Sequence, residues 1–511
     1  MPSMTDRETQ IKTALLSTLN ELTDFLVVSV QDKTSAHDVE QGLWQRMLAL
    51  GHEALKQFFV CCGTGDVGES IVQADGSRLK RFDALRDRAY LTVFGEFSLP
   101  RTVYGRREGQ KIERVPLDAR LQLPERKFSP LLQDWNQSMA TELPFGKVNA
   151  CLTRILGFEQ SVNSLEQSNR SLSGSVTAFW KALPVPTATE EGELLVMTAD
   201  GKGVVMRPGE QDEQAVAAAH KQGRPGNKKM ALIGSVYSVD PYPRLPEQIL
   251  SSLFRDVSDP SSLPKSKRPP PKHKRVRGAL LRNAQGKTDP QSDEIFGWMA
   301  DEARQRGLPG KKTLVMIMDG QGSLWNSGLE QLPEEQFVIT EILDLIHVTS
   351  YVWTASHVFH RKGSPEAIAF AKQQIRCLLN NGVNEVITTL RRKSQQSDLA
   401  STANETLETV CGYFVNHAHR MRYKDYLGQG LPVASGVIEG ACRNLVKDRM
   451  EQSGMRWTMK GAHAMLGLRS IQLSDLWEDF MQVWREGESQ RLYPAAEDCA
   501  NDGLYDQVRL A

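Results

Sequence analysis

Hydrophobic residues recur every three or four positions through the first sixty residues of the chain. One series runs through residues 9–30 and a second through residues 36–60, and this spacing predicts two amphipathic helices. The first series is Ile11, Leu15, Leu19, Leu22 and Leu26. Two interpretations stay open: the helices form a small bundle or dimerisation arm, or they pack on the rest of the chain.

From Ala89 the pattern changes to short β-branched and aromatic runs. AYLTVFG, SLPRTVYG and KIERVPL are separated by turn residues such as RREGQ, which predicts a small sheet. Its tip carries Arg106, Arg107 and Lys111. These side chains either form an ordinary solvated loop or contact phosphates, which requires only positive charge and reach.

Helical spacing returns in residues 145–172 and is broken at Gly157. Two helices joined by a short glycine-containing turn are typical of a helix-turn-helix, with Ser161 as the cap of the second helix. The polar positions of that helix suit contacts to base edges, and they are Asn163, Gln167, Asn169 and Arg170. An ordinary helical hairpin has the same pattern.

Two apolar runs further along the chain each end in an aspartate. ELLVMTA precedes Asp200, and KKTLVMIM precedes Asp319. Asp200-Gly201 is also a hairpin-turn signal, so Asp200 is either a turn residue or a site residue. The run before Asp319 indicates a buried central strand, and ligands bind at strand ends in α/β folds.

The run FVITEILDLIHVTSYVW predicts another strand, which supplies Asp344 and His347. These two residues either support the acidic site from behind or form an ordinary structural pair. Residues 355–428 are polar with continuous helical spacing, which predicts an all-helical insertion.

Two basic segments are candidates for DNA contact. SLPKSKRPPPKHKRVRG predicts an exposed, flexible basic loop that includes Lys272, Lys274 and Arg275. The segment SGVIEGACRNLVKDRMEQSGMRW predicts a helix that begins near Ser435.

In this second segment Glu439, Arg443 and Lys447 follow at i, i+4 and i+8 along one helix face. In one interpretation Glu439 binds a metal while Arg443 and Lys447 contact DNA phosphates. In the other, Glu439 and Arg443 form a surface ion pair worth only a few tenths of a kcal/mol. Arg456 is a further candidate DNA contact, and Trp457 is either a base-stacking residue or part of the core.

Composition excludes some classes of protein. The 62 Lys and Arg balance 62 Asp and Glu, so a polyanionic partner would have to be bound by local basic patches. The seven cysteines have no metal-ligand or disulfide spacing, which favours a reducing cytoplasm. We expect no signal peptide and no membrane span, because no apolar run approaches about 18 residues.

Three distant carboxylates, Asp200, Asp319 and Glu439, suit Mg²⁺, which prefers hard oxygen ligands and keeps several waters. Two such ions about 3.5–4 Å apart activate the attacking oxygen and stabilise the leaving oxygen in phosphodiester cleavage. The hypothesis is therefore a two-ion Mg²⁺ site, with Mn²⁺ as a possible substitute.

These segments resemble the DDE transposases of bacterial insertion sequences, within them the Kra-type group. The likeness lies in ADGKGV around Asp200, VMIMDGQGSLW around Asp319, ILDLIHV, and the long block GLPVASGVIEGACRNLVKDRMEQSGMRWTMKGAHAMLGLR that contains Glu439. It covers residues 193–469 well and the N-terminal third in outline.

The resemblance implies an RNase H-like core that is interrupted by the helical insertion, with Asp200, Asp319 and Glu439 as the acidic triad. It implies cleavage of the element ends and transfer of the freed 3′-hydroxyl into target DNA, by a homo-oligomer on DNA. Relatives often carry cysteines near the segment that corresponds to Tyr104–Lys111, and their absence here predicts no zinc in that sheet. The alternatives are an inactive or domesticated DNA-binding protein, or an RNase H-like nuclease without strand transfer.

The predicted fold class is a multidomain α+β protein. The predicted segments are a helical region (1–75), a small sheet with a helix-turn-helix (76–185), the first part of the catalytic core (190–354), the insertion (355–430), the final core helix (431–485) and an acidic tail (486–511).

Overall fold

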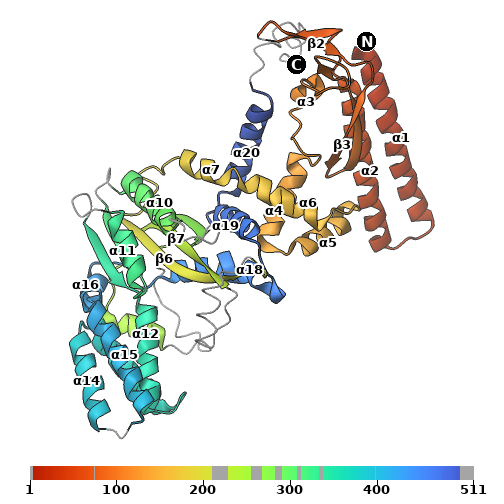
Figure 1. The fold of residues 1–511 in the computed structure, drawn as a ribbon. Helices are drawn as coiled ribbons and strands as arrows, with labels where there is room; N and C mark the ends of the chain where they lie inside the picture. The colour runs from red at the N-terminus through yellow and green to blue at the C-terminus, as the bar shows by residue number, and fades with distance from the viewer. Residues whose placement is uncertain are drawn as a thin grey trace. The chain divides into compact units, whose positions relative to one another are not determined.

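The fold is described from a computed structural model of the chain (Figure 1). The residues that it describes are 4–73, 75–209, 228–254, 268–281, 291–307, 312–332, 338–396 and 399–494. The chain is a mixed α+β protein that divides into two compact units. One unit contains Met1–Ser171 and Glu478–Ala511, and the other contains Leu172–Trp477.

The two predicted N-terminal helices are confirmed as α1 (Met4–Gln31) and α2 (Ala36–Cys62), which lie side by side (Figure 1). Ser35 caps α2 by accepting a hydrogen bond from the amide of Asp38. The guanidinium of Arg46 in α2 lies 3.7 Å from the centre of the Phe25 ring in α1. The hairpin is thus held by contacts between the two inner faces.

The expectation that no segment is apolar enough to cross a membrane is not supported for α1. By length and composition alone, residues Glu8–Gln31 meet that criterion, with 6% of the apolar window buried. Glu21 and Asp24 stand in this stretch, and each acid would be costly in a bilayer. A helix near an N-terminus with this composition is weak evidence for a span.

The small sheet of the first unit is two sheets. Strands β3 (Arg86–Thr92) and β4 (Gly95–Arg101) form an antiparallel pair, as the alternating pattern predicts. Strands β1 (Ser70–Val72), β2 (Arg78–Arg81) and β5 (Tyr104–Gly105) form a separate three-stranded sheet. The sequence pattern missed β1 and β2 because β1 has only three residues and β2 is mostly basic.

A cluster of helices completes the first unit. They are α3 (Pro116–Arg120), α4 (Pro130–Glu142), α5 (Phe145–Leu156), α6 (Val162–Ser173) and α20 (Trp477–Leu492). The predicted helix pair is confirmed as α5 and α6, and α5 ends at Gly157 with φ 80°. One core joins α4, α5 and α6 through Leu132, Leu152 and Leu165.

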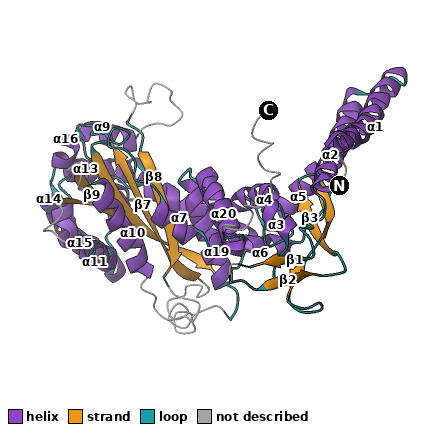
Figure 2. Ribbon diagram, turned by 90° about the horizontal axis from the view of Figure 1, so that it is seen from above, coloured by secondary structure: helices purple, strands orange, loops and turns teal. Residues whose placement is uncertain are grey.

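The second unit is built on a five-stranded mixed sheet with the order β10-β9-β6-β7-β8. Figure 2 shows this sheet, with β7, β8 and β9 labelled. Its strands are β6 (Leu194–Val205), β7 (Lys228–Val239), β8 (Lys272–Leu280), β9 (Thr313–Met318) and β10 (Ile339–Leu343). Strand β6 pairs antiparallel with β7 and parallel with β9, β10 lies parallel to β9, and β8 antiparallel to β7.

The interpretation of Asp200-Gly201 as a hairpin turn is wrong. Strand β6 continues through both residues to Val205, and Asp200 pairs with Ile233 of β7. Gly201 and Gly203 do not end the strand, because both pair with residues of β7 and their backbone stays extended.

Helices flank the sheet in the same unit. They are α7 (Val176–Ala182), α9 (Pro246–Leu253), α10 (Gln291–Arg306), α11 (Gly322–Glu330) and α19 (Met459–Leu473). The outer edge of β8 is covered by α19, because the hydroxyls of Ser474 and Ser470 accept hydrogen bonds from the amides of Val276 and Gly278. Edge amides left unpaired would promote association with other strands.

The helices predicted over residues 355–428 are confirmed, but this helical segment, here called the insertion, begins earlier than predicted. Its helices are α12 (Leu345–Phe359), α13 (Pro365–Leu379), α14 (Val383–Gln396), α15 (Ser401–His417), a short 3₁₀ turn (Ala418–Arg420) and α16 (Tyr423–Gly428). The strand predicted over residues 337–353 is therefore wrong beyond Leu343. An uninterrupted apolar run does not distinguish a buried strand from a buried helix.

The insertion shares one hydrophobic core with the sheet. Val315 of β9 and Ile342 of β10 belong to the same cluster as Phe370, Leu390 and Phe414 of the insertion. In addition, the hydroxyl of Tyr423 donates to the carbonyl of Leu343, at 2.9 Å. The insertion therefore packs directly against the edge of the sheet that carries β9 and β10.

Candidate acidic site at the sheet edge

Three aspartates follow directly after a row of paired strand residues. Met318 of β9 lies between Ala199 of β6 and Leu343 of β10, with all three strands parallel. The next residue in each strand is an aspartate: Asp200, Asp319 and Asp344. Strands β9 and β10 end here and β6 continues to Val205, and because the three run parallel in this register their backbones bring the aspartates together.

The turn after β9 fixes Asp319. Its Oδ1 accepts a hydrogen bond from the amide of Gln321 at 2.9 Å, and its carbonyl accepts one from Nε1 of Trp325 at 2.6 Å. Trp325 is buried, so the turn is anchored to the core of the unit. The half-buried carboxylate of Asp319 thereby stays at the sheet edge.

Helix α17 (Gly436–Cys442) brings Glu439 to the same edge. Its Ile438 and Cys442 are buried, and the Sγ of Cys442 donates to Oδ2 of Asp200 at 3.4 Å. Glu439 lies on the exposed face of the helix, one turn before Cys442. The segment after the insertion is thus in direct contact with Asp200.

The carboxylates of this cluster share one electrostatic environment. Burial raises the pKa of Asp200, and the negative charge of Asp319 adds to that rise. Burial also raises the pKa of Glu439, with further contributions from the charges of Asp344 and Asp200. Removing negative charge from water and placing other negative charges nearby both disfavour ionisation. A positive charge among these carboxylates would stabilise their ionised forms.

His347 is the positively charged group of this cluster. Its Nδ1 lies 3.2 Å from Oδ2 of Asp344, and this hydrogen bond is the main reason that its pKa rises to about 9. The charges of Asp319 and Asp200 raise the pKa further. His347 lies in the first turn of α12, whose N-cap is Asp344.

Among the described residues, Asp344, His347 and Glu439 form a group whose potential ligand atoms all lie within 4.8 Å of one another. The predicted metal ligands are Asp200, Asp319 and Glu439, so the two groups share only Glu439. Asp200 and Asp319 are linked to it through the shared row of strand ends and through their charges. Asp344 and His347 are thus part of the acidic cluster itself.

The helix predicted through Glu439, Arg443 and Lys447 is not a regular α-helix. A π-helical turn, η3 (Arg443–Lys447), follows α17 and precedes the short α18 (Asp448–Met450). The wider turn changes the angular spacing, and Arg443 pairs with Asp448 at 3.5 Å. Arg443 and Lys447 are nevertheless exposed, as is Arg456 after the 3₁₀ turn η4 (Gln452–Gly454).

The base-stacking interpretation of Trp457 is not supported, because this residue belongs to the core. It is 9% exposed, and its Nε1 donates to the carbonyl of Met450 at 3.0 Å. Its backbone amide donates to the carbonyl of Val205, and its carbonyl accepts from Arg207, beside the end of β6. Trp457 therefore holds the chain after α18 against the sheet.

The predicted basic loop is only partly a loop. Residues 272–275 begin strand β8, while residues 255–267 lie outside the described part of the chain. Lys272 pairs with Asp240 at 2.9 Å, and Lys274 is half-buried. Arg275 is not a DNA contact, because it is buried and pairs with Glu302 at 2.7 Å.

Some polar positions of α6 point into the first unit. Asn169 is 2% exposed and donates to Gln137 of α4 at 2.9 Å, so its prediction as a base contact is wrong. Asn163, Gln167 and Arg170 are exposed. Arg106 and Arg107 are also exposed, in the loop after β5, and Arg106 lies 3.5 Å from Glu113.

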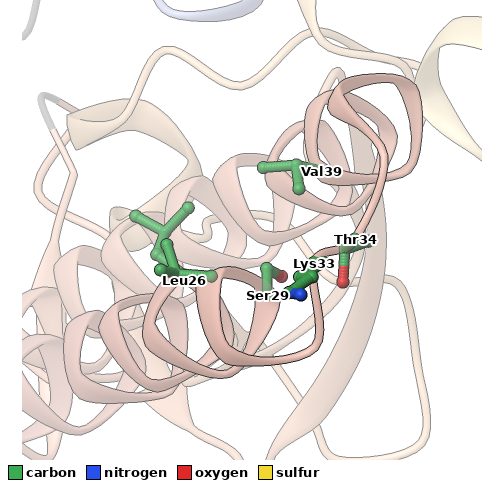
Figure 3. Close-up of a pocket in the computed structure, with 6 residues that line it drawn as sticks. Leu26, Ser29, Lys33, Thr34 and Val39 are labelled. Atoms are coloured by element: carbon green, nitrogen blue, oxygen red, sulfur yellow. The ribbon is translucent and has the colours of Figure 1, made fainter.

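An open hollow of about 460 Å³ lies where the α1–α2 hairpin turns (Figure 3). It is lined by Leu26, Ser29, Val30, Lys33, Thr34 and Val39. None of these residues belongs to the predicted site, and the lining offers a single charged side chain. The hollow therefore does not compete with the acidic cluster as the candidate functional site.

No family model and no curated protein matches this chain. Among solved structures, a Drosophila P element transposase strand transfer complex is a match at 13% sequence identity and a TM-score of 0.24. The match covers 70% of this chain and 81% of the other. That TM-score is too low to support an argument, so the function is inferred from the residues of the site.

Sequence reasoning missed the roles of Ser435 and Cys442 in the acidic cluster. The sequence identifies Ser435 only as a helix start, and it does not single out Cys442. The spacing between Cys442 and Glu439 contained the signal, since residues three apart on a helix lie on neighbouring positions of its surface. The contact of Ser435 with Asp344 spans 91 positions, so no local pattern indicates it.

Proposed function

We propose that the chain is a DNA transposase of the DDE type, in which Asp200, Asp319 and Glu439 hold divalent magnesium or manganese. The observation that carries the proposal is the parallel register of β6 and β9, in which Asp200 and Asp319 follow the paired residues Ala199 and Met318, together with the contact of α17 with Asp200. Carboxylates from three separate segments, at a shared edge, are the ligand type that Mg²⁺ prefers.

The raised pKa values of Asp200 and Glu439 support a cation at this position. Burial is the largest cause of both rises, and the charges of neighbouring carboxylates add to it. Positive charge from a bound cation would favour the ionised carboxylates, since an opposite charge stabilises them. The residues present therefore fit the metal that the resemblance implies.

An RNase H-like core is part of the proposal, and the strand order supports it. Strands β6, β7 and β8 are sequential antiparallel neighbours on one side, and β9 and β10 lie parallel to β6 on the other. Helices α12 to α16 stand between the last strand and α17, where the resemblance implies an insertion.

Bound divalent ions would supply Lewis acidity and a nucleophilic oxygen for cleavage of the phosphodiester. The chain itself has three tasks. Asp200, Asp319 and Glu439 fix the ions at the sheet edge, the buried strands keep these ligands rigid, and exposed basic residues neutralise DNA phosphates. The exposed candidates in the second unit are Arg443, Lys447 and Arg456.

Arg106, Arg107 and Arg170 are the exposed candidates for phosphate contact in the first unit. We propose that the substrates are the two ends of a mobile element and a target duplex, and that the chain acts as a homo-oligomer in the cytoplasm. Each lysine or arginine that contacts a phosphate contributes about one unit to the slope of log affinity against log salt concentration.

The test uses the purified full-length chain and DNA cloned from both sides of its gene. Wild-type protein with Mg²⁺ is expected to nick this DNA and to join the freed ends to a plasmid. Asp319→Asn is expected to abolish both reactions while DNA binding is kept. Asp301→Asn is the matched control, because Asp301 is an exposed carboxylate of α10 in the same unit.

Each outcome decides between the candidate functions. Nicking without joined products would favour a nuclease that lacks strand transfer. DNA binding without any metal-dependent nicking would favour an inactive or domesticated DNA-binding protein. Wild-type levels of strand transfer by Asp319→Asn would refute the assignment of the site.

A further inference from the structure

Asp344 is completely buried at the end of β10, where four donors bind its carboxylate. Oδ1 accepts from the amides of Ile346 at 2.9 Å and Ser435 at 3.3 Å. Oδ2 accepts from Nδ1 of His347 at 3.2 Å and, through a short hydrogen bond, from the hydroxyl of Ser435. A carboxylate has about four acceptor positions, so little capacity is left for a cation.

Ser435, which donates to Asp344, is the N-cap of α17. The carbonyl of Ser435 accepts hydrogen bonds from the amides of Ile438 at 2.8 Å and Glu439 at 3.0 Å. The position of Ser435 therefore sets the position of the first turn of α17. Glu439 lies in that turn.

The backbone of Asp344 is fixed to the sheet on its other side. Its amide donates to the carbonyl of Met318 at 2.9 Å, directly before Asp319. The amide of Leu345 donates to the carbonyl of Val433 at 3.0 Å, beside Ser435. The residues that enter and leave the helical insertion, 91 positions apart, are thereby joined at the acidic site.

We infer that Asp344 is a positioning residue: through Ser435 it holds the Glu439 helix at the sheet edge that carries Asp319, and through His347 it places an imidazole beside the carboxylates. This inference rests on the proposed function, because it assigns Glu439 to a metal site. It also assigns Asp344 a role other than ligand, although its oxygen lies within 4.8 Å of ligand atoms of His347 and Glu439.

A role in stability alone and a role in positioning predict different effects of the Ser435 hydroxyl. If Ser435 only stabilises the fold, its removal lowers the melting temperature and leaves the folded site unchanged. If it positions Glu439, its removal weakens binding of the metal in protein that is fully folded. Residues that orient metal ligands typically change metal affinity by about 10–100-fold when they are replaced.

The experiment measures Mn²⁺ binding to the full-length chain, from the electron paramagnetic resonance signal of free Mn²⁺, together with calorimetric melting. Ser435→Ala and Asp344→Asn are expected to weaken Mn²⁺ binding by about 10-fold or more. Ser435→Thr keeps the hydroxyl and is expected to bind Mn²⁺ within about 3-fold of wild type, a margin well below that range.

Ser356→Ala is the matched control for stability. Its hydroxyl is also completely buried, lies in α12 and donates to the carbonyl of Ala367 at 2.9 Å. This variant is expected to melt at a lower temperature and to bind Mn²⁺ as wild type does. If Asp344→Asn does not fold, Ser435→Ala decides, because it removes one hydroxyl group only.

Two results would overturn the inference: wild-type Mn²⁺ affinity in Ser435→Ala, or an equal loss of affinity in Ser356→Ala. A failure of the proposed function gives a different result. In that case wild-type protein binds no Mn²⁺, or Asp319→Asn binds it as tightly as wild type does, whatever the Ser435 variants do.

Discussion

Replacement of Arg306 by methionine tests whether a buried ion network supports the sheet that carries the acidic site. The Arg306 side chain is 0% exposed and lies 2.6 Å from Glu191 and 3.2 Å from Glu302. Glu191 precedes β6 and also pairs with Lys312, which precedes β9. The network thus joins the starts of β6, which contains Asp200, and β9, which Asp319 follows.

The size of the effect follows from burial. Removal of Arg306 takes one charged hydrogen bond from each of two buried glutamates, which keep Lys312 and Arg275 as partners, and the two losses together cost about 3–5 kcal/mol. Unfolding of a unit of about 300 residues, Leu172–Trp477, has an entropy near 0.6 kcal/mol per kelvin. Arg306→Met is therefore expected to lower the melting temperature of that unit by about 5–8 °C.

Differential scanning calorimetry at neutral pH measures this shift. Arg304→Met is the matched control on the same helix, because the Arg304 side chain is 40% exposed and pairs with Asp301 at 3.0 Å. An exposed pair of this kind is worth about 0–1 kcal/mol. The reasoning is refuted if Arg306→Met shifts the melting temperature no more than Arg304→Met does.

Three further predictions concern the acidic site and its surroundings. The imidazole of His347 should titrate near pH 9 in NMR spectra, and Asp344→Asn should lower its pKa. Because the pKa is raised in the folded state, the stability from this charged pair is full below about pH 6.5 and is lost as the pH rises through 9. An ordinary histidine pKa would contradict the hydrogen bond between His347 and Asp344. Gly320→Ala should reduce DNA nicking by about 10-fold or more, because its Cβ would overlap the ring of Tyr413 and even a 1 Å displacement near a reacting group is costly. Gly322→Ala is the control and should behave as wild type, because a Cβ there meets open space. Equal activity of the two variants would argue against a tightly fixed Asp319 turn. Trp457→Phe should lower the free energy of unfolding by about 1–3 kcal/mol in urea, because the buried carbonyl of Met450 loses its donor. Unchanged stability with weaker DNA binding would instead support a base-stacking role.

Much of the second unit follows from the pattern of the chain. The apolar runs before Asp200 and Asp319 are strands, and the polar helical segment is an insertion. These elements are long and strongly periodic, so local pattern and tertiary environment agree. The two aspartates also lie where a strand-end argument puts them, beside each other on parallel neighbours.

The errors arise where tertiary contacts decide the local structure. Residues 345–353 are as apolar as a strand, but they form α12 because they are covered by the insertion. The π-helical turn at Arg443–Lys447 interrupts a helix that spacing alone predicts as regular. Arg275 lies in a basic stretch, yet its partner Glu302 is 27 positions away.

The role of Asp344 could not be predicted either, because it also depends on tertiary contacts. Its tie to Ser435 closes an insertion whose ends meet only in the folded chain, so a short motif cannot reveal it. Sequence reasoning identified Asp344 and His347 as neighbours of the site because both follow an apolar run. It did not indicate which groups they bind.

Crystals of the full-length chain with Mn²⁺, measured at the manganese absorption edge, test the central claim most directly. The account predicts anomalous density in contact with the carboxylates of Asp200, Asp319 and Glu439, and none at these residues in crystals of Asp319→Asn. Manganese bound only elsewhere, or carboxylates of Asp200 and Asp319 that share no ion, would contradict the assignment of this sheet edge as the catalytic site.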